Sequence, residues 1–162
     1  MMPELSMNIL DVAENSVRAK ASLITIIVDV QRQSDSLTVI IEDDGCGMTQ
    51  EQILSVTDPF FTTRTTRKIG LGVPFFKMAA ESTGGSLTIA STPGVGTRVT
   101  AVFGLSHIDR MPLGDISSTI YTLITFNTDI DFVYTYRFDE NEFTLDTREF
   151  KEILEGIPLD AP

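Results

Sequence analysis

Three polar side chains near the start of the chain have the types and spacing of a magnesium and phosphate site. Asp11 and Asn15 stand four residues apart and Arg18 follows three later, so on a helix all three project from one face. An amide oxygen can ligate a hard cation, a carboxylate can orient a water or hydroxyl, and a guanidinium can hold a phosphate. Polar residues at this spacing are also typical of a solvated helix face, so both interpretations stay open.

A second candidate is the sequence Asp-Asp-Gly-Cys-Gly over residues 43–47, which follows a predicted strand. Gly45 and Gly47 permit unusual backbone angles and let a ligand approach the main chain closely. Asp43, at the end of a buried strand, can accept a hydrogen bond from an exocyclic amine. A tight turn leading into a helix over 49–56 explains the same residues equally well.

The third candidate is the segment 58–72, which begins Asp-Pro-Phe-Phe-Thr-Thr and ends Gly-Leu-Gly. It predicts a mobile lid that brings cations and backbone N–H groups to phosphates at the N-terminus of a helix that Pro74 can begin. A solvated basic loop is the alternative. The lid residues that we expect to contact phosphate are Arg64, Lys68, Gly70, Leu71 and Gly72.

Composition narrows the class of protein. The 162 residues suffice for one domain or one domain with an extension, and the single cysteine, Cys46, excludes an internal disulfide. The net charge of −11 argues against a nucleic-acid partner. With no apolar run of membrane-spanning length and no signal-peptide pattern, we expect a cytoplasmic protein without a membrane partner.

The elements that must position these candidates follow from hydrophobic periodicity. Apolar residues share one face of the first helix, and β-branched runs predict antiparallel strands over 22–30 and 37–43. After a helix over 74–82, a second hairpin joins strands at 86–91 and 97–103. The order of elements predicts an α+β fold, with one layer of helices on a mixed, mainly antiparallel sheet.

The last third of the sequence differs from the rest. Residues 105–162 hold 12 acids and 4 bases, whereas residues 1–104 hold 11 acids and 8 bases. We predict a linker over 106–115, then an extension over 116–162 formed by a hairpin of strands at 116–126 and 130–138, a short strand near 143–145 and a helix over 147–155. This β-rich extension is expected to pack on residues 1–105 or on a partner.

Taken together, these motifs resemble the GHKL ATPase superfamily of histidine kinases, anti-sigma-factor serine kinases, type II topoisomerases, Hsp90 chaperones and MutL proteins. Residues 11–18 resemble its N box, 43–47 its first glycine box, 58–63 its F box and 70–72 its second glycine box. Residues 84–97 resemble the closing hairpin of histidine-kinase catalytic domains. The resemblance implies a two-layer α/β sandwich of the Bergerat type over residues 1–105, with ATP and Mg²⁺ as ligands.

The resemblance also implies roles for single residues. Asn15 would ligate magnesium, Asp43 would accept the adenine amino hydrogen, and Asp11 matches a position that holds the general base in the hydrolysing and serine-kinase branches. A second-shell magnesium contact is the alternative for Asp11. The remaining nucleotide contacts implied are Arg18, Gly45, Gly47, the lid residues named above and Thr97, which would reach adenine through water.

Two departures from the family pattern shape the functional prediction. Lys68 stands where many histidine kinases have a lid glycine, and only about ten residues precede the N box, too few for a phosphoacceptor hairpin. His107, the single histidine, lies in the predicted linker and is expected to be an ordinary linker residue. We therefore expect transfer of the γ-phosphate to an unidentified partner protein in trans. A nucleotide-gated interaction module and a slow ATPase are the alternatives, and the sequence leaves a homodimer open.

Overall fold

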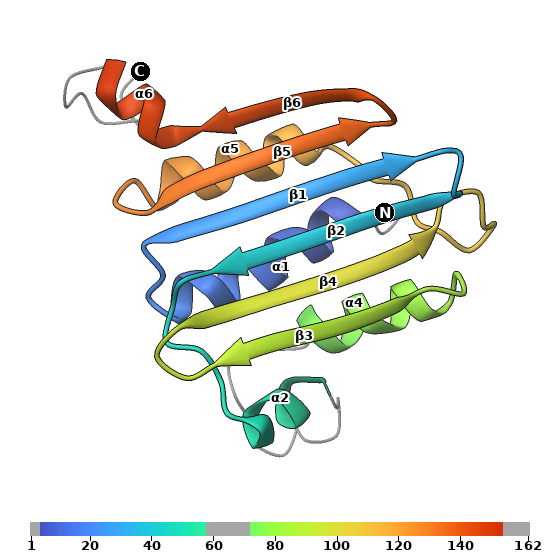
Figure 1. The fold of residues 1–162 in the computed structure, drawn as a ribbon, viewed down its shortest axis with the longest axis horizontal. Helices are drawn as coiled ribbons and strands as arrows, with labels where there is room; N and C mark the ends of the chain where they lie inside the picture. The colour runs from blue at the N-terminus through green and yellow to red at the C-terminus, as the bar shows by residue number, and fades with distance from the viewer. Residues whose placement is uncertain (1–3, 58–71, 154–162) are drawn as a thin grey trace.

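The computed structural model describes residues 4–57 and 72–153. In this part of the chain the order of elements is α1 (Leu5–Arg18), β1 (Leu23–Gln31), β2 (Ser36–Asp43), α2 (Gln50–Thr57), α4 (Gly72–Glu81), β3 (Ser86–Thr92), β4 (Gly96–Gly104), α5 (Ile116–Phe126), β5 (Asp131–Phe138), β6 (Asn141–Asp146) and α6 (Thr147–Ile153). Figure 1 shows these elements along one continuous sheet.

The described strands form a six-stranded sheet in the order β3-β4-β2-β1-β5-β6. β1 pairs with β5 in parallel, while β1–β2, β2–β4, β3–β4 and β5–β6 are antiparallel. The prediction of a mixed, mainly antiparallel sheet is therefore confirmed. The register places Asp43, the last residue of β2, opposite Thr97 of β4.

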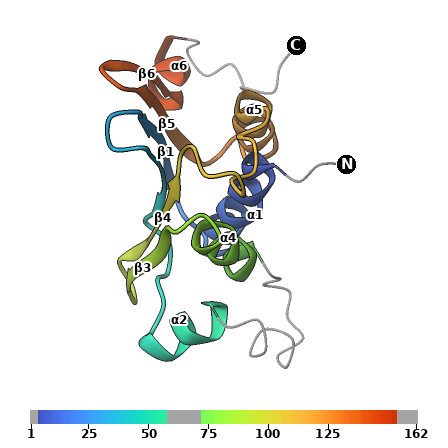
Figure 2. The same cartoon turned by 90° about the vertical axis from the view of Figure 1, so that its right-hand side faces the viewer.

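One face of the sheet is covered by α5, α1 and α4, which lie side by side in that order (Figure 2). The burial of β1 alternates residue by residue, so that Ile24, Ile26 and Val28 face the helices. On α1 the buried apolar residues recur at helical spacing from Leu5 to Ala13. The apolar residues on these strand and helix faces pack together in one hydrophobic core, which extends from α4 to β5.

The prediction of a strand at 116–126 is wrong, because these residues form helix α5. Asp115 caps the helix, since its carboxylate accepts a hydrogen bond from the Ser118 backbone N–H at 3.0 Å. The topology explains why a helix is needed here. β4 and β5 run in the same direction, and parallel strands require the chain to cross back over the sheet, which α5 does.

The C-terminal elements extend the sheet of the N-terminal ones. β5 pairs with β1 along its full length, and Leu123 of α5 belongs to the same core as Ile9 of α1. The first N–H groups of α1 are also bonded from this side, since those of Leu5 and Ser6 donate to the carbonyls of Pro112 and Leu113, each at 2.9 Å. The division of the chain at residues 106–115 stays a prediction.

The remaining sequence expectations agree closely with the described elements. The strand bounds differ by a residue or two, the strand near residue 143 is β6, and the helix that follows it is α6. No described helix has the length and hydrophobicity that crossing a membrane requires.

Candidate functional site

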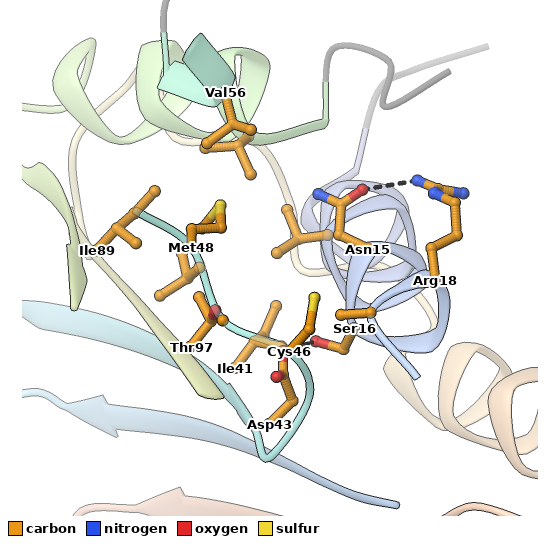
Figure 3. Close-up of a pocket in the computed structure, with 15 residues that line it drawn as sticks. Asn15, Ser16, Arg18, Ile41, Asp43, Cys46, Met48, Val56, Ile89 and Thr97 are labelled. Atoms are coloured by element: carbon orange, nitrogen blue, oxygen red, sulfur yellow. Dashed lines mark hydrogen bonds between the residues drawn. The ribbon is translucent and has the colours of Figure 1, made fainter. Parts of the chain in front are cut away.

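A cavity of about 240 Å³ opens between the C-terminal half of α1 and the end of β2. Its walls are mostly apolar, and Figure 3 shows Met48, Ile89 and Val56 on the side away from Asn15 and Arg18. Asp43 is the one carboxylate among the lining residues that the structure describes, which are Val12, Asn15, Ser16, Arg18, Ala19, Ile41, Asp43, Cys46, Gly47, Met48, Val56, Val73, Ile89, Thr97 and Val99. The arrangement suits a flat apolar ligand with a hydrogen-bond donor at one edge.

Two hydrogen bonds fix the orientation of the Asp43 carboxylate. Its Oδ2 accepts from the Ser16 hydroxyl at 2.5 Å, and its Oδ1 accepts from the Gly45 backbone N–H at 2.8 Å. Each carboxylate oxygen has two lone-pair sites, so both retain capacity for a ligand donor. Asp43 is therefore an oriented acceptor at the edge of an apolar cavity.

The loop after Asp43 requires glycine at the two positions that the sequence indicates. Gly47 has a φ of +72°, and a side chain there would collide with the Thr92 carbonyl. A Cβ at Gly45 would lie 2.7 Å from the Ala19 carbonyl oxygen. Cys46, which stands between the two glycines, connects the loop to α1 and to the β3–β4 turn. Its backbone N–H donates to the Ala19 carbonyl at 3.0 Å, and its backbone carbonyl accepts from the Gly94 N–H at 2.7 Å. The exposed Cys46 thiol lines the cavity.

Asp44 anchors the same loop to the start of β1. Its carboxylate accepts from the Ser22 hydroxyl at 2.6 Å and from the backbone N–H groups of Ser22 and Leu23 at 2.7 and 3.0 Å. The hydrogen bond from the Ser22 hydroxyl is the largest cause of a lowered Asp44 pKa, which partial burial opposes. Asp44 thus stays ionised and holds the loop that orients Asp43.

The predicted polar stripe on α1 is divided between the cavity and the surface beside it. Asn15 and Arg18 line the cavity, and the Arg18 guanidinium donates to Asn15 Oδ1 at 2.6 Å. Asp11 is outside the lining set and its side chain is exposed. Even so, partial burial of its carboxyl raises the Asp11 pKa, which the nearby Arg18 charge lowers by a smaller amount.

Gly72 is the predicted lid residue that falls within the described chain. It is the first residue of α4, and a Cβ built on it would lie 3.1 Å from the Asp11 Cβ. The N-terminus of α4 therefore meets α1 at Asp11. The predicted contacts Arg64, Lys68, Gly70 and Leu71 lie outside the described residues.

Thr97 lines the cavity and is hydrogen-bonded to Ser91, a residue outside the lining set that sequence reasoning missed. Its hydroxyl lies 2.7 Å from the Ser91 hydroxyl, and Ser91 Oγ also accepts from the Met48 N–H at 2.8 Å. Ser16 was missed as well. The sequence holds a signal for Ser16, because a polar residue stands at a position that continues the apolar stripe of α1. In the structure Ser16 is only 5% exposed, and a buried polar group requires a hydrogen-bond partner.

A model of one protein family matches residues 3–107, and the family is described as "Histidine kinase-, DNA gyrase B-, and HSP90-like ATPase". The chain belongs to this family. The histidine kinase-like ATPase domain thus spans α1 to β4, the elements that form the cavity.

Curated relatives of this ATPase domain are bacterial sensor proteins. The chain is 34% identical over 108 residues to the sensor protein kinase FleS of Pseudomonas aeruginosa, covering 67% of this chain and 26% of the relative. It is 31% identical over 99 residues to the signal transduction histidine-protein kinase AtoS of Escherichia coli, covering 60% and 16%. A putative sensor protein of Shewanella frigidimarina is 33% identical over 85 residues, covering 52% and 13%. The chain therefore spans about a quarter or less of the length of these relatives.

Solved structures support the same fold. The N-terminal domain of a DNA repair protein superposes with a TM-score of 0.64 at 13% identity, covering 88% of this chain and 52% of that one. The MutL ATPase domain of Aquifex aeolicus, complexed with ADP, gives 0.55 at 13% identity, covering 96% and 70%. The predicted two-layer ATP-binding fold is confirmed, and family membership supports ATP binding.

The donor set near the cavity suits magnesium held together with phosphates. In the described ranges, 4–57 and 72–153, no group of three or more His, Cys, Asp or Glu side chains could hold a metal ion. Mg²⁺ usually keeps several waters and takes few protein oxygens besides substrate phosphates. Asn15, whose amide oxygen is a hard ligand, fits that pattern.

Proposed function

We propose that this chain binds Mg-ATP in the cavity and transfers the γ-phosphate to a partner protein in trans. The observation that carries the proposal is the Asp43 carboxylate, oriented by Ser16 and Gly45 at the edge of an otherwise apolar cavity in a histidine kinase-like ATPase domain. Adenine has a flat apolar ring and an exocyclic amine, and the cavity offers an apolar slot and a fixed acceptor.

The phosphate side of the proposal rests on α1 and α4. Asn15 would hold Mg²⁺ through its amide oxygen, and Arg18, bonded to that oxygen, would approach the phosphates. When bound, Mg²⁺ supplies positive charge that offsets the charge of the transferring phosphoryl group. The N-terminus of α4 adds backbone N–H groups and a favourable dipole for anions.

Asp11 is the residue that we propose as general base. It is exposed beside the first residue of α4, where a hydroxyl or water can reach it. Its raised pKa makes the carboxylate a stronger base than an ordinary aspartate, since base strength follows pKa. A second-shell contact to Mg²⁺ is the alternative role.

A nucleotide-gated interaction module is the second candidate function. It is favoured by two strongly exposed aromatic side chains on α5, Tyr121 and Phe126, because exposed aromatics are enriched at protein interfaces. In that case ATP binding would order a surface for a partner and turnover would be slow or absent.

Calorimetric titration tests the site assignment. We would titrate wild type, Asp43→Ala and Asn15→Ala with ADP and a non-hydrolysable ATP analogue, with and without magnesium. Asp43→Ala is expected to abolish binding, and Asn15→Ala to remove its magnesium dependence. Matched controls are Glu42→Ala, on the same strand but outside the cavity, and Asn8→Ala on the same helix. Wild type that binds no adenine nucleotide would contradict the proposal.

The fate of a radiolabelled γ-phosphate separates the two functions. Label on a partner protein supports the kinase, and label on free phosphate indicates an ATPase. Label that stays on ATP supports the interaction module. Asp11→Asn is expected to abolish transfer while leaving ADP affinity unchanged, because Asp11 does not line the cavity.

A further inference from the structure

Arg18 forms a hydrogen bond to the atom that the proposed function assigns to magnesium. Its Nη2 donates to Asn15 Oδ1 at 2.6 Å, and Figure 3 shows the two side chains turned toward each other. Asn15 is half-buried, whereas Arg18 is exposed. Both residues line the cavity, so this hydrogen bond lies inside the proposed site.

The Asn15 side chain can serve either Arg18 or a metal ion. A side-chain amide has one oxygen, and its nitrogen carries only donors, so Oδ1 is the one side-chain atom of Asn15 that can ligate a metal. Mg²⁺ on that oxygen, at the usual distance of about 2.1 Å, would lie close to the guanidinium, and like charges at short range repel each other. The hydrogen bond in the structure and the proposed metal contact therefore exclude each other.

The bond that holds Arg18 is weaker than the bonds that a phosphate would offer. Within residues 4–57 and 72–153, Arg18 takes part in no ion pair, and its hydrogen bond goes to a neutral amide. Hydrogen bonds between a guanidinium and a phosphate are charge-assisted and frequently bidentate. The phosphates of a nucleotide would therefore draw Arg18 away from Asn15.

We infer that Arg18 is a positioning residue that controls access to Asn15: it covers the amide oxygen until a nucleotide phosphate draws the guanidinium away. The inference rests on the proposed function, since it requires the cavity to bind a nucleotide. It predicts a fixed order, in which Asn15 becomes available to magnesium together with the nucleotide or after it. It also predicts that Asn15 holds Arg18 back from a nucleotide that arrives without a metal.

Paramagnetic broadening by Mn²⁺ tests this order. Mn²⁺ takes the same kinds of oxygen ligand as Mg²⁺, and it broadens the nuclear magnetic resonance signals of nearby groups. In wild type, the signal of the Asn15 side-chain amide is expected to broaden only when ADP is present. In Arg18→Met it should broaden with Mn²⁺ alone, because Asn15 and Asp11 then offer two oxygen ligands one helical turn apart.

Lys20→Met is the matched control for the loss of a positive charge. Lys20 is an exposed cation two residues after Arg18, and it lies outside the cavity. Its substitution removes the same charge as Arg18→Met and should leave the response to Mn²⁺ as in wild type. The dispersion of the backbone amide signals shows whether each variant is folded.

Calorimetric titration with ADP in the absence of magnesium gives a second measurement. Asn15→Ala is expected to raise the affinity for ADP about three-fold, the value of a modest hydrogen bond, because Arg18 is then no longer held back. The same substitution in an Arg18→Met background should leave the affinity unchanged.

The possible results distinguish this inference from the proposed function. Wild type that binds no ADP would overturn both. If ADP binds, and Mn²⁺ alone affects the Asn15 signal equally in wild type and Arg18→Met, the inference fails and the proposed function stands. The inference also fails if Asn15→Ala lowers the magnesium-free affinity by the same factor with and without Arg18, because Asn15 would then contact the nucleotide itself.

Discussion

Helices α1 and α5 lie side by side in one layer and bury apolar stripes in the same core, yet their outward faces differ. The outward side of α1 carries Asp11, Glu14 and Arg18, whereas α5 has no charge along its length. The contrast in charge made α1 recognisable as an amphipathic helix and hid α5. The two outward surfaces also differ in their proposed function. The surface of α1 lies beside the proposed site of a charged small molecule, whereas the surface of α5 is proposed to contact another protein.

The shared core is tested by truncating one buried side chain on each helix. Ile9 is fully buried and Leu123 is 1% exposed, so Ile9→Ala and Leu123→Ala should each lower the free energy of unfolding by about 3 kcal/mol. Urea denaturation followed by circular dichroism is expected to give one shifted transition for both. If Leu123→Ala left the main transition unchanged, α5 would fold apart from α1 and the comparison would fail.

A buried hydroxyl on each helix separates ligand binding from stability. Ser16→Ala removes the donor to Asp43 and should weaken ADP binding about ten-fold, since a hydrogen bond to a charged group is worth about 1.5–3 kcal/mol. Thr119, whose hydroxyl donates to the Ser6 carbonyl at 3.3 Å, is the matched position on α5. Thr119→Ala should lower stability by about 1 kcal/mol and leave affinity intact, as calorimetry and thermal unfolding would measure. Equal losses of affinity in both variants would contradict the assignment of Ser16.

The two helices also begin differently. Asp115 caps α5 through its side chain, and Asp115→Ala should lower stability by about 1 kcal/mol. The N-cap of α1, Glu4, makes no side-chain cap bond, and backbone carbonyls of Pro112 and Leu113 serve instead. Glu4→Ala should therefore change stability by less than about 0.5 kcal/mol. A larger loss for Glu4→Ala in thermal unfolding would show that the backbone carbonyls do not suffice.

The smallest expected effect concerns Asp11. Because its pKa is raised in the folded protein, the ionised carboxylate disfavours folding at neutral pH, and the penalty disappears below the ordinary value of 3.8. Asp11→Asn should thus stabilise the protein at pH 7, by less than about 0.5 kcal/mol because the group is exposed and screened, and not at pH 3. Asp129→Asn, an exposed acid beyond α5, controls for general loss of negative charge. If Asp11→Asn and Asp129→Asn changed the free energy of unfolding in the same way at pH 7 and at pH 3, the raised pKa of Asp11 would not be the cause.

Sequence patterns predicted the elements that have strong periodicity and the residues that sit in motifs. Helix α1, strands β1 to β4 and the cavity residues Asn15, Asp43 and Thr97 were found in this way. The residues that these patterns missed form hydrogen bonds with residues that are distant in the sequence. Ser16 bonds Asp43 at a separation of 27 residues, and the distance between Ser91 and Met48 in sequence is larger still. Such contacts depend on how a helix and a loop pack against strands from other parts of the chain, which local periodicity does not encode.

Helix α5 was missed for a different physical reason. Its run of Ile, Thr, Tyr and Phe has the intrinsic preference of a strand, and a helix with a neutral outer face lacks the polar–apolar alternation that distinguishes the two. The apolar residues of its buried side do recur at helical spacing. The need to cross the sheet between β4 and β5 outweighed local preference.

The parallel pairing of β1 with β5 has a consequence for synthesis. Leu23 pairs with Asp131. During synthesis, one edge of β1 therefore stays unpaired until about a hundred further residues have been added to the chain. At synthesis rates of about 5–20 residues per second, this interval lasts on the order of ten seconds. During that interval a strand rich in isoleucine and valine has open N–H and C=O groups. The nascent chain can therefore aggregate through this open strand edge until its last third has been synthesised.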